Sequence, residues 1–302
     1  MKNSVYELES SLNTYTLDKN RISLLRECLI FKKETIGEVF FDYHHHDLYE
    51  ILYVKSGKVL YSIEEKKYIL NPGDIIFISP SKLHRLNSIE SSNCERIVIN
   101  FTEDLINKIS TPKTNLLQIF KLIDESKNYK LKIHLNQIKN IESLLEAMLN
   151  SQFSDEFGCD IIFYITFSQL MINLNKMYMN TEIFAEPIIN NKVVNKITDF
   201  IMDNIDQKLS IEQVASFVNL STSRVQHIFK NETGISLNSY ITKKKLLKAT
   251  ELLRNNEKSI DIYEKCGFQN YTSFLRAFKN EYGLTPKEYI QAHKNRFEIQ
   301  YF

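Results

Sequence analysis

The sequence predicts an α+β chain with an N-terminal β-barrel and flanking helices, followed by an all-α C-terminal domain with two helix-turn-helix units. Three observations lead to this fold class. Short apolar runs of β-type residues recur between residues 28 and 101. Apolar residues at helical spacing replace them from residue 103 onward. In the last third, one six-residue segment returns 49 residues later with little change.

The predicted strands of the N-terminal part are short and evenly spaced. They are rich in β-branched and aromatic residues, and turn-forming segments separate them: 55–57, 64–67 and 71–74. Such a series is typical of a sandwich or a barrel. The expected strands are 28–31, 49–54, 59–63, 74–78 and 96–101.

Residues 103–180 change to a helical pattern. One helix face collects Ile138, Ile141, Leu145 and Met148, and a second apolar run extends from Ile161 through Met179. We expect two or three helices beside the barrel. One of them is a candidate for contact with a second subunit, although packing within one chain explains the same stripe equally well.

The repeated segment of the C-terminal part lies at the C-terminal ends of two similar predicted helices. It reads Phe229-Lys230-Asn231-Glu232-Thr233-Gly234 in the first copy and Phe278-Lys279-Asn280-Glu281-Tyr282-Gly283 in the second. A tight turn and a shorter apolar helix, 209–218 or 260–266, precede each copy, which is the helix-turn-helix plan. A plain helical bundle is the alternative, but it does not require polar faces twice at matching positions.

The second helix of each unit carries polar side chains that can contact base edges or phosphates. Ser221 and Asn270 are good N-cap residues, so each helix can present its N-terminal end to a groove. The candidate DNA-binding residues are Ser223, Arg224, Gln226, His227 and Lys230 in the first unit, and Tyr271, Thr272, Ser273, Arg276 and Lys279 in the second.

The charge is unevenly distributed along the chain. Residues 191–302 contain 17 basic and 12 acidic residues, a net charge of +5, whereas residues 1–190 contain 21 and 25, a net charge of −4. The positive part therefore coincides with the repeats, as expected for a DNA-binding domain. The run Lys243-Lys244-Lys245 with Lys248 is a candidate phosphate-binding cluster, and a solvated helix face is an equal alternative.

Cysteine usage and hydropathy exclude other classes. The four cysteines, Cys28, Cys94, Cys159 and Cys266, are far apart and form no CxxC pair, so we expect reduced, packed thiols rather than disulfides or a zinc knuckle. No run of 18 apolar residues and no signal peptide is found. These features predict a cytoplasmic protein with no membrane partner.

Histidines gather just before the second predicted strand. His44, His46, Glu50 and Gly57 follow the spacing HxHxxxExxxxxxG, and His84 lies where a later strand returns to the same barrel mouth. Three imidazoles and a carboxylate could hold a divalent transition metal with open positions. A pocket for a small-molecule ligand needs the same few polar groups, and we favour that interpretation, with neither a metal nor another cofactor assigned.

At this point the chain resembles the AraC/XylS family of transcriptional regulators over nearly all of its length. Residues 192–293 resemble the family's double helix-turn-helix domain, and residues 28–101 its cupin-type sensor barrel. The C-terminal matches are the segment 209–215, Ser221, Phe229-Lys230, Gly234, Tyr240, Ala249, Leu252-Leu253, Gly267-Phe268, Phe274, Arg276, Phe278-Lys279 and the segment 283–289. The barrel matches are His44, His46, Tyr49-Glu50, Gly57, Pro72-Gly73-Asp74, Pro80 and His84.

The resemblance implies a sensor barrel at 1–102, a helical part at 103–180 that is a candidate for dimerisation, a linker at 181–191, a DNA-binding domain at 192–293 and a tail at 294–302. It also implies a long helix near 239–255 that sets both recognition helices on one face of double-stranded DNA. A homodimer, a small-molecule effector and a contact with RNA polymerase, as an activator has, are the expected partners. Arg276 is the best candidate for a base contact, because a guanidinium pairs bidentately with guanine.

Some positions depart from the family pattern. Tyr263 stands where a small residue equivalent to Ala215 is usual, in a segment one residue short, and Lys245 and Ile290 each replace a usual arginine. We therefore expect the first helix of the second unit to pack differently. A metal-dependent cupin oxygenase or isomerase is the competing class, but it gives the repeated unit no role, so the sequence favours a regulator that is not an enzyme.

Overall fold

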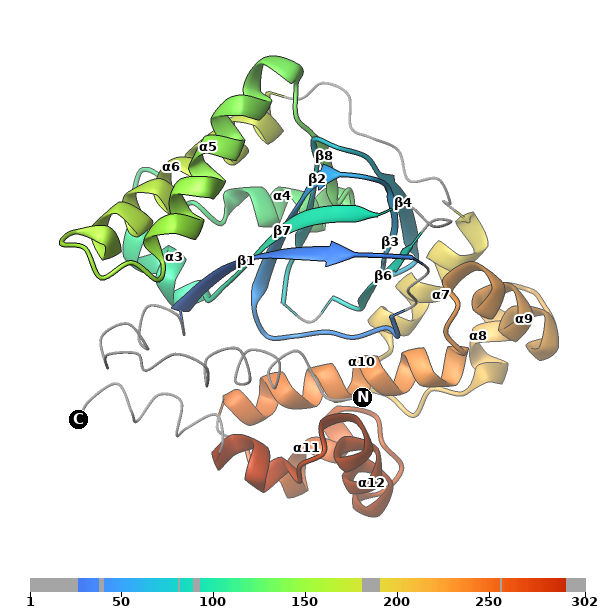
Figure 1. Ribbon diagram of the computed structural model, residues 1–302. Helices are drawn as coiled ribbons and strands as arrows, with labels where there is room; N and C mark the ends of the chain where they lie inside the picture. The colour runs from blue at the N-terminus through green and yellow to red at the C-terminus, as the bar shows by residue number, and fades with distance from the viewer. Residues whose placement is uncertain are drawn as a thin grey trace. The chain divides into compact units, whose positions relative to one another are not determined.

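The computed structural model describes residues 27–37, 41–80, 82–88, 93–180, 191–255 and 257–291. The chain divides into two compact units, Met1–Ile188 and Ile189–Phe302. The predicted α+β class is confirmed, because the first unit combines sheets with helices and the second is helical (Figure 1). The N-terminal segment 1–26, most of the predicted linker and the tail 294–302 lie outside the described residues.

The N-terminal unit contains two antiparallel sheets. The strands of the larger sheet lie in the order β1 (Cys28–Thr35), β7 (Cys94–Phe101), β2 (Tyr49–Ser56), β5 (Asp74–Ile78) and β8 (Lys130–Lys132). The smaller sheet has the order β4 (Lys66–Leu70), β3 (Val59–Ile63) and β6 (His84–Ser88). All five strands expected from the sequence are present, and β4, β6 and β8 are added to them.

The strand β4 corrects a predicted turn. The segment 64–67 is polar enough to be taken for a turn throughout, but the turn consists of Glu64 and Glu65 alone, with Glu64 at a φ of 52°. Lys66 and Lys67 already pair with Ile63 and Ser62 of β3. A hairpin with a two-residue turn requires such left-handed backbone, which a charged residue adopts less readily than glycine.

The two faces of the larger sheet have different neighbours. On one face Tyr49 stacks on Phe101 at 5.4 Å between ring centroids, and Phe101 contacts Phe120 and Phe167, so helices cover this face. On the other face Glu50 accepts a hydrogen bond at 3.1 Å from the hydroxyl of Tyr61 in the smaller sheet. The barrel interior therefore lies between the two sheets.

Four helices accompany the sheets, where the sequence predicted two or three: α3 (Glu103–Ile109), α4 (Gln118–Ser126), α5 (Leu135–Ser151) and α6 (Cys159–Met179). The helices α3 and α4 are short, at seven and nine residues, so each offers only about two turns of helical pattern in the sequence. The helices α5 and α6 lie side by side (Figure 1). Gln152, at the end of α5, donates to the carbonyl oxygen of Ile30 at 2.6 Å and so holds α5 against β1.

Gly57 lies in the turn between β2 and β3, with a φ of 78°. A Cβ atom at this position would lie 2.0 Å from the carbonyl oxygen of Asn93, which precedes β7. Only glycine permits this close approach of two backbones. The glycine of the histidine motif thus has a structural role in closing the barrel.

In the described residues the C-terminal unit contains α7 (Lys192–Asp203), α8 (Ile211–Phe217), α9 (Thr222–Thr233), α10 (Leu237–Arg254), α11 (Ser259–Lys265) and α12 (Tyr271–Tyr282), and a further helical segment spans residues 286–291. Both predicted helix-turn-helix units form, as α8–α9 and α11–α12. The long helix α10, expected near 239–255, contacts α9, α11 and α12 (Figure 1). No helix among the described residues has the length and apolar composition needed to cross a membrane.

Candidate nucleic-acid interface and histidine cluster

The helices α9 and α12 begin and end in the same way. The side chain of Ser221 accepts a hydrogen bond from the backbone N–H of Arg224, and that of Asn270 accepts one from the N–H of Ser273. Gly234 and Gly283 end the helices in left-handed conformation, with φ values of 79° and 71°. The predicted N-cap and the predicted C-terminal glycine are therefore present in both helices.

The buried sides of the two helices also match. Val225 and Phe229 are fully buried in the first unit, and Phe274 and Phe278 in the second. Because these positions correspond at a spacing of 49 residues, the outward positions correspond too. The candidate residues pair as Ser223 with Thr272, Arg224 with Ser273, His227 with Arg276 and Lys230 with Lys279, while Gln226 corresponds to Leu275.

Most of these candidate DNA contacts are exposed. All five candidates of α9, together with Thr272, Arg276 and Lys279 of α12, lie on the open face of their helix. Within α9, the ring nitrogens of His227 lie 3.3–3.4 Å from the amide nitrogen of Asn231, which supports the orientation of the imidazole. Each helix thus presents a polar ridge of about three turns.

Two candidates of α12 are only half exposed. The ring of Tyr271 packs near Phe274, and its hydroxyl lies 3.1 Å from the hydroxyl of Ser259 at the start of α11. The hydroxyl of Ser273 donates to the carbonyl oxygen of Asn270 at 2.8 Å. Both side chains therefore make contacts within the second helix-turn-helix unit. They also lie at the N-terminal end of the polar ridge of α12.

The second unit departs from the first where the sequence indicated. Backbone hydrogen bonds from Leu220 to Ala215 and from Phe268 to Tyr263 place Tyr263 at the position of Ala215. Ala215 is buried, whereas Tyr263 is half exposed and its hydroxyl donates to Glu264. Moreover, α11 lacks the capping box that Ser210 forms at the start of α8.

The lysine run of α10 does not form a solvated cluster. Lys243 is paired with Glu281 of α12, and Lys244 and Lys245 are buried. The ammonium group of Lys245 donates to the carbonyl oxygens of Gln207 and Gly267. This run therefore connects parts of the C-terminal unit, and the phosphate-binding role considered for it does not fit its burial.

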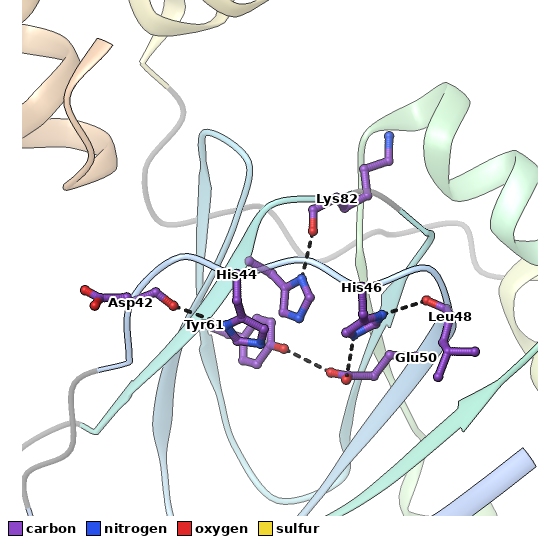
Figure 2. Close-up of polar contacts among 8 residues, drawn as sticks. Asp42, His44, His46, Leu48, Glu50, Tyr61 and Lys82 are labelled. Carbon is purple, nitrogen blue, oxygen red and sulfur yellow. Dashed lines mark hydrogen bonds and ion pairs between the residues drawn. The ribbon is translucent and has the colours of Figure 1, made fainter. Parts of the chain in front are cut away.

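In the N-terminal unit, the structure brings together the four residues of the predicted ligand site. His44 pairs with His84 through two backbone hydrogen bonds of 3.0 and 2.9 Å, and their ring centroids are 4.3 Å apart. The ring centroid of His46 lies 4.9 Å from that of His84. Glu50 lies four residues after His46, near the start of β2 (Figure 2). The cluster is therefore built from β2, β6 and the segment before β2.

Each of the three imidazoles is oriented by a backbone carbonyl group. The Nδ1 atom of His44 lies 3.1 Å from the carbonyl oxygen of Asp42. The Nδ1 atom of His46 lies 2.9 Å from the carbonyl oxygen of Leu48, and the Nδ1 atom of His84 lies 2.8 Å from the carbonyl oxygen of Lys82 (Figure 2). Since a carbonyl oxygen only accepts, each Nδ1 carries the proton. The Nε2 atoms remain for other contacts.

The Nε2 atoms of His46 and His84 have different surroundings. That of His46 lies 3.2 Å from Oε2 of Glu50, and the two side chains are only 7% and 10% exposed. That of His84 is buried and has no hydrogen-bond partner among the described residues. The nearest ligand atoms of His46, Glu50 and His84 all lie within 4.8 Å of one another.

The electrostatics separate the two histidines. Burial opposes charge on His46, but the hydrogen bond and attraction of Glu50 outweigh it and raise the pKa of His46. Burial would raise the pKa of Glu50, yet its contact with His46 dominates and lowers that pKa to about 2. Burial, reinforced by His44 and His46, lowers the pKa of His84 well below its ordinary value. The contact with Glu50 thus favours the charged form of His46, whereas burial favours the neutral imidazole of His84.

Sequence reasoning missed two polar side chains of the barrel interior. Tyr61 donates to Oε1 of Glu50, and alternation along β3 would have placed it inward. Arg96 is buried and donates to the hydroxyl of Thr35 at 2.5 Å. Because Arg96 and Asn100 are four residues apart in β7 and Asn100 pairs with Glu50, Arg96 shares the face of the sheet that carries Glu50.

Comparison with known families matches most of the chain. The sequence model described as "AraC-like ligand binding domain" matches residues 32–164, and the one described as "Helix-turn-helix domain" matches residues 214–292. The first match contains the histidine cluster, and the second contains both α9 and α12.

Named relatives match the chain over most of its length. The chain is 25% identical to the HTH-type transcriptional activator RhaS of Enterobacter sp. (strain 638) over 85% of this chain and 90% of that protein. It is 26% identical to RhaS of Klebsiella pneumoniae (strain 342), over 83% and 88% of the two chains. A crystal structure of ToxT from Vibrio cholerae aligns with 15% identity and a TM-score of 0.35, over 87% of this chain and 96% of that one.

Proposed function

Because the chain belongs to the AraC/XylS family of transcriptional regulators, with a ligand-binding and a helix-turn-helix domain, we propose that α9 and α12 read two successive segments of one operator. The supporting observation is that both helices present exposed polar side chains at equivalent positions, with equivalent caps and buried residues. A helix that enters the major groove by its N-terminal half requires this combination.

The proposed roles follow from the chemistry of each side chain. His227 and Arg276 occupy the same helical position and contact base edges, since imidazole and guanidinium groups hydrogen-bond to guanine. Lys230 and Lys279, one turn further along, neutralise phosphates and give affinity without specificity. The remaining proposed contacts are Ser223, Arg224, Gln226, Tyr271, Thr272 and Ser273, which lie at the N-terminal ends of the helices.

For the N-terminal unit we propose that the effector binds at His44, His46, Glu50 and His84. An effector changes DNA binding only if it has different affinities for two arrangements of the regulator. The Nε2 atom of His84, which has no hydrogen-bond partner in the described part of the chain, and the accessible edge at His44 supply a hydrogen-bonding site for such a ligand.

A homodimer is part of the same proposal. On α6, Ile161 and Ile165 are 57% and 64% exposed and lie one turn apart, and Phe157 is fully exposed just before the helix. A contiguous apolar patch of this kind marks an interaction site. A second copy of the chain is the proposed occupant, because operators read by such regulators are matched by symmetric oligomers.

The cellular context is proposed on the basis of the DNA partner. A bacterial regulator meets DNA and RNA polymerase in the cytoplasm, and activation requires contact with the polymerase, as the name of the RhaS relatives suggests for this chain. We propose no catalytic activity, because the duplicated DNA-binding unit has no function in an enzyme.

Selection of DNA fragments by the full-length protein tests this function. Genomic fragments, including the DNA upstream of the gene itself, are bound at two salt concentrations with excess competitor. We expect one fragment class to be retained, and Arg276→Ala to lose that retention while Lys176→Ala, an exposed lysine of α6, keeps it. Equal retention of all fragments by both variants would contradict the proposal.

A further inference from the structure

We propose that His46, Glu50 and His84 form a binding site for one divalent first-row transition metal ion. This inference deepens the proposed effector site, because it names the chemical class of the ligand, and it rests on that proposal only for its regulatory meaning. The three side chains offer two imidazole nitrogens and one carboxylate oxygen within 4.8 Å of one another. Two histidines and one carboxylate are a common ligand set for such ions, with further positions left open.

The hydrogen bonds select the correct nitrogen of each histidine. In both His46 and His84 the Nδ1–H group donates to a backbone carbonyl oxygen, of Leu48 and Lys82 respectively. The Nε2 atom is therefore the one that can offer a lone pair to a metal, directly in His84 and, in His46, once the proton shared with Glu50 leaves. Metal-binding histidines in proteins usually have this outer contact, because it fixes the tautomer and the ring orientation.

The carboxylate of Glu50 is oriented in the same way. Its Oε1 atom accepts a hydrogen bond from the hydroxyl of Tyr61 at 3.1 Å, which leaves Oε2 facing His46. Figure 2 shows the hydroxyl of Tyr61 and the ring of His46 directed at the two oxygens of Glu50. The carboxylate therefore has one oxygen held by the protein and one available as a ligand.

The separation of the first two ligand atoms fits a coordination sphere. The Nε2 atom of His46 lies 3.2 Å from Oε2 of Glu50. Two ligands about 2.1 Å from a metal are about 3.0 Å apart at a right angle and about 3.4 Å apart at a tetrahedral angle. A metal ion can thus take the place of the proton between these two atoms with little movement.

The third ligand atom distinguishes a metal site from a simple ion pair. The pairing of His46 with Glu50 explains their own contact, but it leaves the Nε2 atom of His84 buried without a partner among the described residues. Buried acceptors are nearly always satisfied. A cation bound between the three side chains satisfies this atom once the imidazole approaches to bonding distance.

His44 lies beside this three-residue group, on the side from which an ion could reach it. Its ring packs edge-on against His84, and the residue is exposed. An ion can enter from this side, and a water or a signal molecule can occupy the remaining coordination positions. The regulator would then report the presence of the metal ion or of a ligand attached to it.

Metal uptake by the untagged full-length protein tests this site. The protein is stripped with EDTA and dialysed against Co²⁺ or Zn²⁺, and bound metal is measured by elemental analysis and by the visible spectrum of Co²⁺. We expect one ion per chain. Glu50→Gln and His84→Gln each should weaken binding at least tenfold, whereas His134→Gln, which removes an exposed histidine outside the cluster, should leave it unchanged.

The thermal unfolding of the metal-free variants shows whether they fold, and operator binding by the same metal-free samples separates the two proposals. A wild-type protein that selects an operator but takes up no metal overturns the metal site and leaves the regulator intact. Uptake that neither Glu50→Gln nor His84→Gln reduces also overturns it. Metal uptake lost in both variants supports the site, even if no operator is selected.

Discussion

The ammonium nitrogen of Lys245 lies 2.6 Å from the carbonyl oxygen of Gly267. The same nitrogen lies 3.1 Å from the carbonyl oxygen of Gln207, which precedes α8, while Gly267 belongs to the turn between α11 and α12. Lys245 itself is on α10 and is only 7% exposed. One buried cation therefore links the entry of the first helix-turn-helix unit to the turn of the second.

Replacement of Lys245 should destabilise the C-terminal unit. Lys245→Met keeps the aliphatic packing but leaves the carbonyl oxygen of Gly267 without a charged donor, so we expect a loss of about 1–3 kcal/mol in the free energy of unfolding. Lys245→Arg should lose less, because a guanidinium still donates to both carbonyl oxygens. Urea unfolding measures both; equal stability of Lys245→Met and wild type would show that the contact contributes nothing.

Gly267→Ala should disturb the same contact between Gln207, Lys245 and the turn that contains Gly267. Gly267 has a φ of 66°, and a Cβ atom would lie 2.1 Å from the carbonyl oxygen of Gln207. The methyl group must separate these backbones and strain the turn, so we expect a loss of roughly 1–3 kcal/mol. Gly283→Ala is a matched control, because its Cβ meets nothing within 4 Å and only the positive φ is unfavourable. A larger loss at Gly283 than at Gly267 would contradict the steric argument.

The repeated helices were predictable from the sequence because their signals are local. N-caps, the glycines at the helix ends and the apolar spacing all lie within about a dozen residues, so α9 and α12 and their outward faces follow directly. Three members of the histidine cluster were predictable for a similar reason, since HxHxxxE places His44, His46 and Glu50 on one segment and the strand that follows it.

Contacts between distant segments were not predictable in the same way. Lys245 meets Gln207 and Gly267 across 38 and 22 residues, and its sequence neighbours suggest only a basic surface. The half burial of Tyr271 likewise depends on Ser259 in another helix. The orientation of His84 by the carbonyl group of Lys82 required the backbone geometry at the start of β6.

Arg276 and Lys279 should differ in the kind of binding they lose. Loss of a bidentate base contact in Arg276→Ala should cost about 1–3 kcal/mol on the selected operator and relax the preference at one base pair. Lys279→Ala should weaken all sequences alike and reduce the slope of log K against log salt by about 1. Titrations of the operator and of a shuffled duplex at several salt concentrations measure both; a uniform loss for Arg276→Ala would exclude a base-reading role.

The Cys266 thiol should be unreactive in the folded protein. Burial raises the pKa of Cys266 to about 12, and the residue is fully buried in the core of the second helix-turn-helix unit. Because only the thiolate reacts, iodoacetamide at pH 8 should modify Cys266 at the rate at which the unit opens, and urea should accelerate the reaction strongly. Peptide mapping by mass spectrometry measures this rate. Rapid modification without denaturant would show that this core is open.

The exposed apolar stripe of α6 should control the oligomeric state. Ile161→Glu or Ile165→Glu places a charge where the proposed partner packs, so we expect a dimer to become a monomer in sedimentation or light-scattering measurements. Both positions are exposed within one chain, and the thermal stability of the monomer should therefore change little. Lys176→Glu, an exposed substitution near the other end of the helix, is the control for added negative charge. If the wild type is already monomeric at micromolar concentration, or if the Ile variants remain dimeric, the stripe does not serve as the interface, and operator binding should then show no dependence on protein association.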